Sequence, residues 1–164
     1  MGGYQVSFFN PIGSPSFQSI LGQAPSFQPT ALYYGLLFVI SANYLSPWVM
    51  IPTVSVGSSS KIKAYGFDNY DHYSFLLLNK DSNSSAKGTV SVYLSYKTGI
   101  RCMFLSAASL NSTAGISLNG YSFTSNNSNA QGEFAMKTYQ VDADGVYNVP
   151  LSYSEVIFCR SIIS

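Results

Sequence analysis

The sequence predicts a mainly β protein, an antiparallel β-sandwich of about eight strands that follows an N-terminal strand, loop and apolar helix. One observation is a series of short segments with alternating apolar and polar residues, which begins at Lys61 and is separated by turn-forming clusters. Another is that no charged residue precedes Lys61, while five of the seven prolines lie in the first 50 residues. We therefore divide the chain at the "VGSSSK" stretch, into residues 1–57 and a sandwich domain of residues 58–164.

The N-terminal zone holds one strand candidate and one helix. Residues 3–10, "GYQVSFFN", suit a buried strand, and a loop rich in Pro, Gly, Ser and Gln continues to Pro29. Thr30 is a suitable N-cap, and residues 30–45 form an apolar helix that Pro47 terminates. Such a helix would be about 24 Å long, shorter than the roughly 30 Å hydrocarbon core of a bilayer. Because it is apolar on nearly all sides, we expect it to lie between two protein layers, of which the sandwich of this chain can supply only one.

The second zone contains period-two patterns. In residues 89–94, Val90, Val92 and Leu94 fall on one face, and Ser91 and Tyr93 on the other. Ile116 and Leu118 likewise share a face before an Asn-Gly turn. The expected strands are 61–67, 73–79, 89–94, 100–107, 116–120, 133–139, 145–151 and 154–160, with turn clusters at 79–88, 109–115, 125–132 and 142–145.

The composition argues against some classes of function and favours others. Apolar residues make up 46% of the chain, charged residues 9%, and the net charge is +1. Nucleic-acid binding is not expected, because a phosphate-binding surface needs many cations. Low charge with abundant Ser, Asn and Tyr is typical of extracellular β-rich domains. The three Asn-x-Ser/Thr sequons at Asn83, Asn111 and Asn126 favour a secreted glycoprotein. No signal peptide is recognisable in this chain.

The two cysteines, Cys102 and Cys159, each lie in an expected strand. No Cys/His ligand spacing is present, so we expect no metal and no cofactor. If the chain is secreted and the two strands are neighbours, a disulfide is favoured over two buried thiols.

Two polar clusters invite a catalytic interpretation. Asp68, Asp71 and His72 gather in "DNYDH", and "DADG" at 142–145 holds two carboxylates. The first lies between two expected strands and suits a hairpin loop. A Ser-His-Asp triad is not expected, because the chain has one histidine and no G-x-S-x-G elbow. The second lacks the spacing of a calcium loop and suits a tight turn.

Four segments together resemble one known family. They are 33–39 ("YYGLLFV"), 73–81 ("YSFLLLNKD"), 107–123 with its Leu-Asn-Gly turn, and 146–159 ("VYNVPLSYSEVIFC"). In this order they resemble the C-terminal part of the family-79 glycoside hydrolases, the heparanase and β-glucuronidase group. The resemblance implies that 3–10 and 30–45 are the last strand and helix of a catalytic (β/α)8 barrel, on which the sandwich packs.

The resemblance also implies which partners and residues are missing. Family members are retaining glycosidases that use two carboxylates about 5 Å apart. The glutamates of this chain, Glu133 and Glu155, both fall in the sandwich and match neither catalytic position. We therefore expect a non-catalytic accessory domain that supports a barrel acting on glucuronide-containing glycans.

Three alternatives remain open at this stage. The 13 tyrosines and 11 phenylalanines suit a stand-alone carbohydrate-binding or adhesive module, although no single row of aromatics is marked as exposed. The second alternative is a membrane-tethered sandwich, and the third is a hydrolase with an unfamiliar site. If the helix lacks its outer layer, we also expect the chain to self-associate.

Overall fold

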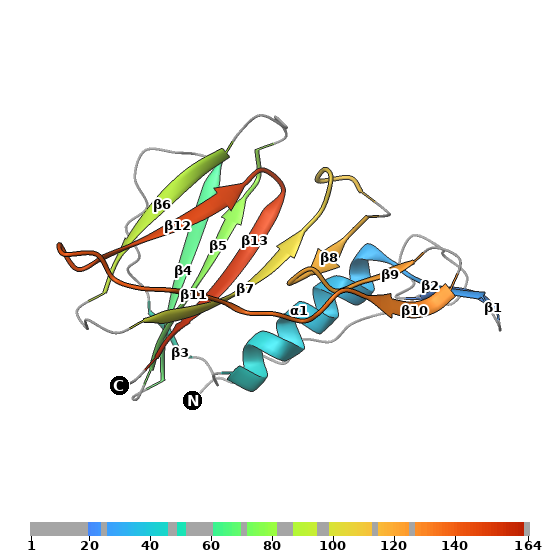
Figure 1. Cartoon of the computed structure of the whole chain (residues 1–164), viewed down its shortest axis with the longest axis horizontal. Helices are drawn as coiled ribbons and strands as arrows, with labels where there is room; N and C mark the ends of the chain where they lie inside the picture. Colours follow the sequence, from blue (N-terminus) through green and yellow to red (C-terminus); the bar gives the residue numbers. More distant parts are fainter. Residues whose placement is uncertain are drawn as a thin grey trace.

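The computed structural model describes residues 20–23, 26–45, 49–51, 61–69, 72–81, 87–94, 99–112, 115–124 and 127–162. These residues form a mainly β fold in which every strand pairing is antiparallel, together with one helix (Figure 1). The elements in chain order are β1 (Ile20–Gln23), β2 (Ser26–Pro29), α1 (Ala31–Leu45), β3 (Val49–Ile51), β4 (Ile62–Asn69), β5 (His72–Asn79), β6 (Lys87–Tyr93), β7 (Ile100–Ser106), β8 (Ser117–Leu118), β9 (Ser122–Thr124), β10 (Asn127–Gln131), β11 (Lys137–Tyr139), β12 (Val146–Ser152) and β13 (Glu155–Ser161).

A seven-stranded sheet forms the centre of the fold. Its strands follow the order β11-β7-β13-β5-β4-β3, and β8 pairs with β7. The last strand along the chain, β13, lies between β5 and β7 and pairs with both. Apolar runs such as Leu76–Leu78 are expected in these strands because both faces of the sheet are covered.

The second layer of the sandwich is the antiparallel pair β6–β12. Along β12 the side chains alternate, so that Tyr147, Val149 and Leu151 are buried while Asn148 and Pro150 are exposed. Together with Val90, Val92 and Leu94, the buried side chains pack on one face of the central sheet. That face presents the buried residues Phe75, Leu77, Ile100, Cys102, Phe104, Ile157 and Cys159.

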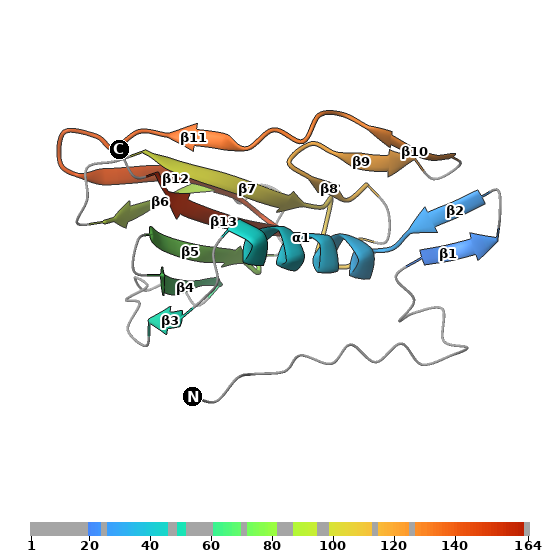
Figure 2. The same cartoon turned by 90° about the horizontal axis from the view of Figure 1, so that it is seen from below.

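Helix α1 covers the opposite face of the central sheet, as Figures 1 and 2 show. Tyr34, Phe38 and Ala42 recur every four residues and are buried, because a spacing of four keeps them on one side of a helix. They pack in a second core cluster with Phe67, Met103, Ile116, Leu118 and Phe158. The sheet therefore has the β6–β12 pair on one face and the helix on the other.

The prediction of the helix is confirmed. The carbonyl of Thr30 accepts the first helical hydrogen bond from the Tyr34 N–H at 3.3 Å, and the helix runs to Leu45. Within the described residues, the sandwich covers one side of this helix and the other side is partly exposed. Val39 is 44% exposed and Ile40 is 64% exposed.

Each of the eight expected strands has a counterpart, but two of them are shorter than expected. Only Ser117–Leu118 and Lys137–Tyr139 of the segments 116–120 and 133–139 pair as strands. The Asn-Gly turn is present, with φ of 54° at Asn119 and 85° at Gly120. The expected strand at 3–10 lies outside the described residues.

The sequence-based expectation was wrong about two hairpins. β1 and β2 pair within the segment expected to be a loop, and β10 falls in the expected turn cluster 125–132, where it pairs with β9. Neither hairpin shows a regular apolar alternation: β1 and β2 contain Gly, Gln and Pro, and β10 is made of Asn, Ser, Ala and Gln. Backbone hydrogen bonding and tertiary contacts override side-chain pattern in such segments. One such contact is the hydrogen bond that the Phe123 N–H donates to the Tyr34 hydroxyl at 2.7 Å.

Candidate functional sites

The two glutamates lie in different settings. Glu133 is exposed, whereas Glu155 at the start of β13 is only 9% exposed. The Ser152 N–H donates to Glu155 Oε2 at 2.8 Å, and the Ser106 hydroxyl donates to Oε1 at 3.3 Å. Both carboxylate oxygens of Glu155 are therefore engaged within the domain, and Glu155 closes the turn between β12 and β13.

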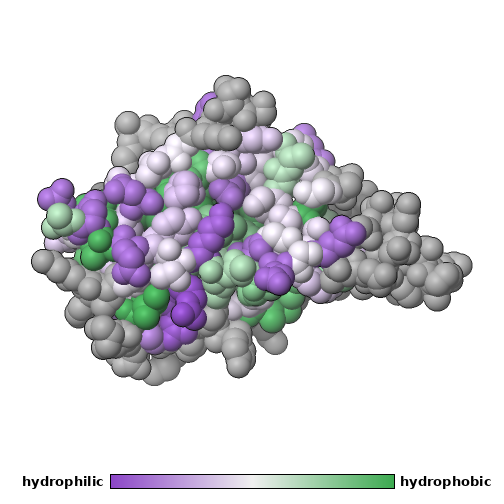
Figure 3. All heavy atoms as spheres, in the orientation of Figure 1, coloured by the Kyte–Doolittle hydropathy of each residue, from purple (hydrophilic) through white to green (hydrophobic). Residues whose placement is uncertain are grey.

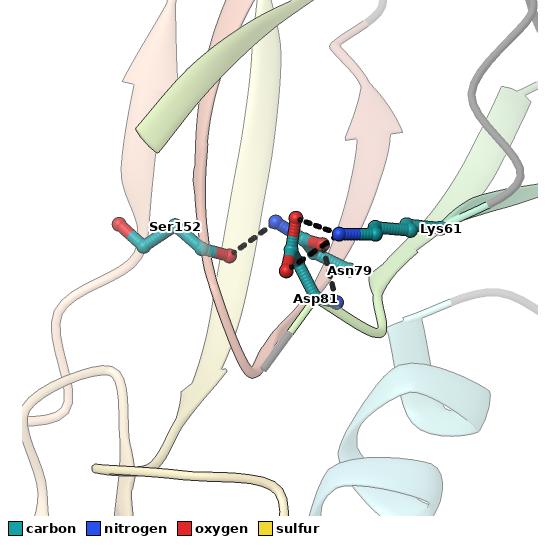
Figure 4. Close-up of polar contacts among 4 residues, drawn as sticks. All are labelled: Lys61, Asn79, Asp81 and Ser152. Carbon is teal, nitrogen blue, oxygen red and sulfur yellow. Dashed lines mark hydrogen bonds and ion pairs between the residues drawn. The ribbon is translucent and has the colours of Figure 1, made fainter. Parts of the chain in front are cut away.

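A polar network continues from this turn to the end of β5 (Figure 4). The Asn79 amide donates to the Ser152 carbonyl at 3.0 Å, and the Asp81 N–H donates to Asn79 Oδ1 at 2.9 Å. Lys61 Nζ contacts both Asp81 carboxylate oxygens at 3.1 and 3.0 Å. Asn79 is buried, so its two bonds satisfy a group that water reaches poorly, whereas the Lys61–Asp81 pair is exposed.

This network joins the two layers of the sandwich. Asn79 belongs to the central sheet, whereas Ser152 ends β12 in the second layer and leads directly to Glu155. Because Glu155 contacts Ser106 at the end of β7, the chain of bonds links four strands at one end of the fold. These hydrogen bonds hold the ends of β5, β7, β12 and β13 in position relative to one another. Sequence reasoning quoted Asn79 and Ser152 as parts of two separate motifs and missed that they meet, since 73 residues separate them.

The remaining acidic clusters lie at a strand connection and in a turn. Asp68 and His72 flank the connection between β4 and β5, and Asp71 lies outside the described residues. The Asp142 carboxylate accepts the backbone N–H groups of Asp144 at 3.0 Å and Val146 at 2.9 Å, which shapes the turn before β12. Within the described part of the chain, no three His, Cys, Asp or Glu side chains are grouped as a metal site.

Cys102 and Cys159 lie directly opposite each other on β7 and β13. The structure joins them by a disulfide with a Cα–Cα distance of 4.1 Å, in the core between the two sheets. Of the three sequon residues, Asn111 is exposed in the turn after β7, while Asn83 and Asn126 lie outside the described residues.

Two tyrosines have shifted ionisation. Burial raises the pKa of Tyr34, against the opposing effect of the hydrogen bond from Phe123, and neighbouring tyrosines add to the rise. Burial also raises the pKa of Tyr139, with a further contribution from the Glu155 carboxylate. Burial is the largest cause in both cases, so both shifts follow from packing.

The fold and these contacts define a β-sandwich domain with one helix packed on its central sheet. The chain belongs to glycosyl hydrolase family 79, since the sequence model of that family's C-terminal beta domain matches residues 64–158. Members of the family are typically extracellular. No curated protein matches the sequence.

Solved glycosidases share the fold. A 4-O-α-L-rhamnosyl-β-D-glucuronidase from Fusarium oxysporum 12S, solved with Rha-GlcA, is 21% identical over 63% of this chain, with a TM-score of 0.52. The family-51 arabinofuranosidase of Xanthomonas axonopodis pv. citri is 15% identical over 88% of the chain, with a TM-score of 0.55. The family-30 xylanase C of Talaromyces cellulolyticus gives 15% identity, 88% coverage and a TM-score of 0.51. The chain spans 24%, 28% and 27% of these three proteins.

Among the described residues, no helix combines the length and the apolar character needed to cross a bilayer. Helix α1 has 15 residues.

Proposed function

We propose that this chain is the non-catalytic accessory domain of a β-glucuronidase- or heparanase-like glycoside hydrolase, and that it supports a catalytic (β/α)8 barrel. Membership of family 79 through its C-terminal beta domain supports the parent class. The glucuronide substrate is proposed by analogy with the Fusarium enzyme, which the chain resembles at 21% identity.

The exposed side of α1 is the observation that carries the proposal. One side of the helix packs on the central sheet through Tyr34, Phe38 and Ala42, while Val39 and Ile40 face outward. In Figure 3 hydrophobic atoms gather near the lower edge of the face, in the region where Figure 1 draws α1. An apolar helix with one layer on one side suits a second layer on the other. We infer that residues 1–57 complete the barrel, with α1 as its last helix.

In this proposal the domain takes no part in catalysis. Both carboxylate oxygens of Glu155 are engaged by Ser152 and Ser106, and Glu133 is exposed on another segment, so we do not assign the two glutamates as a catalytic pair. The purified chain should release no 4-nitrophenol from 4-nitrophenyl β-D-glucuronide. Hydrolysis that Glu155→Gln abolishes and Glu133→Gln leaves intact would contradict the proposal.

Self-association tests the apolar helix face. We expect the chain to associate at micromolar concentration in sedimentation velocity, and Ile40→Lys to shift it to monomer, because the lysine removes apolar area from the contact. Lys63 is an exposed residue on β4, and Lys63→Glu serves as a charge-changing control that should leave association unchanged. A wild-type chain that stays monomeric at all concentrations would argue against an uncovered docking face.

The sequons and the disulfide fit a secreted enzyme. Asn111 lies in an exposed turn that a glycan can occupy without displacing the core. Expression in a eukaryotic secretory system should add a glycan there, detectable as a mass shift that peptide N-glycosidase removes and that Asn111→Gln reduces.

A further inference from the structure

A second surface lies on the side of the central sheet away from α1. It is the outer face of the β6–β12 pair, where Ser91 and Tyr93 of β6 and Asn148 of β12 are exposed. Their strand neighbours Val92, Tyr147 and Val149 point inward and hold the pair on the central sheet. We call the residues Ser91, Tyr93, Asn148 and Asp142 the β6–β12 strip.

Tyr93 is an exposed aromatic beside a turn. It is 71% exposed, and Val146 lies opposite it in the strand register. Its ring lies beside the turn at Gly145, where an added Cβ would come within 3.6 Å of Tyr93 Cε2. The fold gains little from leaving so large a ring in water. The ring is therefore available to a ligand.

The polar members of the strip hold one another in place. The Ser91 hydroxyl donates to Asn148 Oδ1 at 2.9 Å, and Asn148 Nδ2 donates to Asp142 Oδ2 at 3.1 Å. Asp142 is itself fixed by the two backbone N–H groups that its other oxygen accepts. A side-chain amide has two donor hydrogens and two acceptor lone pairs, so Asn148 keeps one of each for a ligand. Preorganised groups of this kind lose little entropy on binding.

The spacing places the ring and the amide within reach of one small molecule. Tyr93 is opposite Val146 and Ser91 is opposite Asn148, so Tyr93 and Asn148 are diagonal neighbours on the same face. Diagonal neighbours in an antiparallel pair lie about 7–8 Å apart. A ligand with an apolar face and hydroxyls at its edge can stack on the ring and bond to the amide at once. A pyranose sugar has both features.

The charge of the strip selects among such ligands. The strip includes the exposed carboxylate of Asp142, and the exposed residue Asp144 lies in the same turn, so the strip repels phosphates and uronate groups. A nucleic acid would stack on Tyr93 but needs cations for its backbone. We propose that the β6–β12 strip binds a neutral glycan, with a sugar ring on Tyr93 and its hydroxyls bonded to Asn148 and Asp142. This site is distinct from the proposed barrel-docking face and does not depend on it.

Affinity electrophoresis of the full chain tests the site. The gels contain arabinoxylan, laminarin or hydroxyethylcellulose as neutral probes, and polygalacturonate as a charged probe. We expect retardation by at least one neutral polysaccharide and none by polygalacturonate. Tyr93→Ala should weaken binding at least tenfold and Asn148→Ala about fivefold, whereas Tyr93→Phe should keep most of it.

Tyr65 provides the matched control. It is a tyrosine on β4 that is 42% exposed, and it belongs to the central sheet instead of the strip. Tyr65→Ala should leave retardation unchanged, and circular dichroism should show that all variants are folded. No retardation by any neutral probe, or equal losses from Tyr93→Ala and Tyr65→Ala, would overturn the proposal. Retardation by polygalacturonate alone would also overturn it. None of these results depends on a barrel, so they leave the accessory-domain proposal standing.

Discussion

Phe38 and Ile40, two positions apart in α1, should differ sharply in their contribution to stability. Phe38 is 5% exposed and packs in the cluster beneath the helix, whereas Ile40 is 64% exposed on the outer side. Truncating a buried Phe to Ala costs about 3–5 kcal/mol, because apolar contacts are lost and a cavity remains. Phe38→Ala should therefore be strongly destabilising.

The expected cost for Ile40 is much smaller. Only about a third of its side chain is removed from water, so Ile40→Ala should cost about 1 kcal/mol on the scale of 2–5 kcal/mol for a fully buried isoleucine. The higher helix propensity of Ala offsets a few tenths of this cost. In a chain of this size, 1 kcal/mol shifts Tm by about 2–4 °C. We expect Phe38→Ala to lower Tm by about 6–20 °C, and Ile40→Ala by no more than about 4 °C.

Thermal and urea denaturation, followed by far-ultraviolet circular dichroism at submicromolar concentration, measure both variants. The low concentration limits association through the helix face. Phe38→Leu, which retains most of the buried volume, should fall between wild type and Phe38→Ala. If Ile40→Ala destabilises as much as Phe38→Ala, the outer side of the helix is covered within the chain itself, and the reasoning for an uncovered docking face fails.

Three further changes probe the interior. Asn79→Ala should lower the free energy of unfolding by about 1–3 kcal/mol in urea titrations, because the Ser152 carbonyl loses its donor, while Ser91→Ala at the surface should have little effect. Replacing Cys102 and Cys159 by Ala should cost about 4 kcal/mol in the chain-entropy model for a separation of 57 residues, and a thiol assay of the unreduced, unfolded wild type should detect no free thiol. Tyr34→Phe should cost about 1 kcal/mol at neutral pH, since the Phe123 N–H loses its acceptor. Because burial raises the pKa of Tyr34 above 10.0, the folded state holds its proton more tightly, so wild-type stability is intact below pH 10 and falls as pH rises beyond it. Tyr34→Phe should make that alkaline fall shallower, and an unchanged slope would contradict the assignment.

Local signals explain the elements that the sequence predicted well. Thr30 marks the start of α1, and the alternation in 89–94 correctly directed Val90 and Val92 inward and Tyr93 outward. Period and capping act within a few residues, so they can be read without knowledge of the fold. The same local rules placed Ile116 and Leu118 together in the core beneath the helix.

The elements that were missed depend on contacts between distant residues. β10 is polar, and no alternation of apolar and polar residues in its sequence predicts its pairing with β9. The β9 backbone is held by the Tyr34 hydroxyl, 89 residues away from Phe123. The sequence also could not show that Asn148 and Asp142 lie near Tyr93, because Asp142 reaches Asn148 only after the turn before β12 forms. The periodicity of a single sequence does not show which distant residues come into contact.

The position of β13 has a consequence for synthesis on the ribosome. Strand β13, Glu155–Ser161, lies in the middle of the central sheet, between β5 and β7. These two strands therefore remain without the strand that pairs with both until almost the whole described chain has been translated. Nascent chains that stop before Glu155 carry two strands with unpaired inner edges, which are targets for chaperones and for aggregation. A premature stop codon just before Glu155 should therefore be as damaging to folding as one before β5.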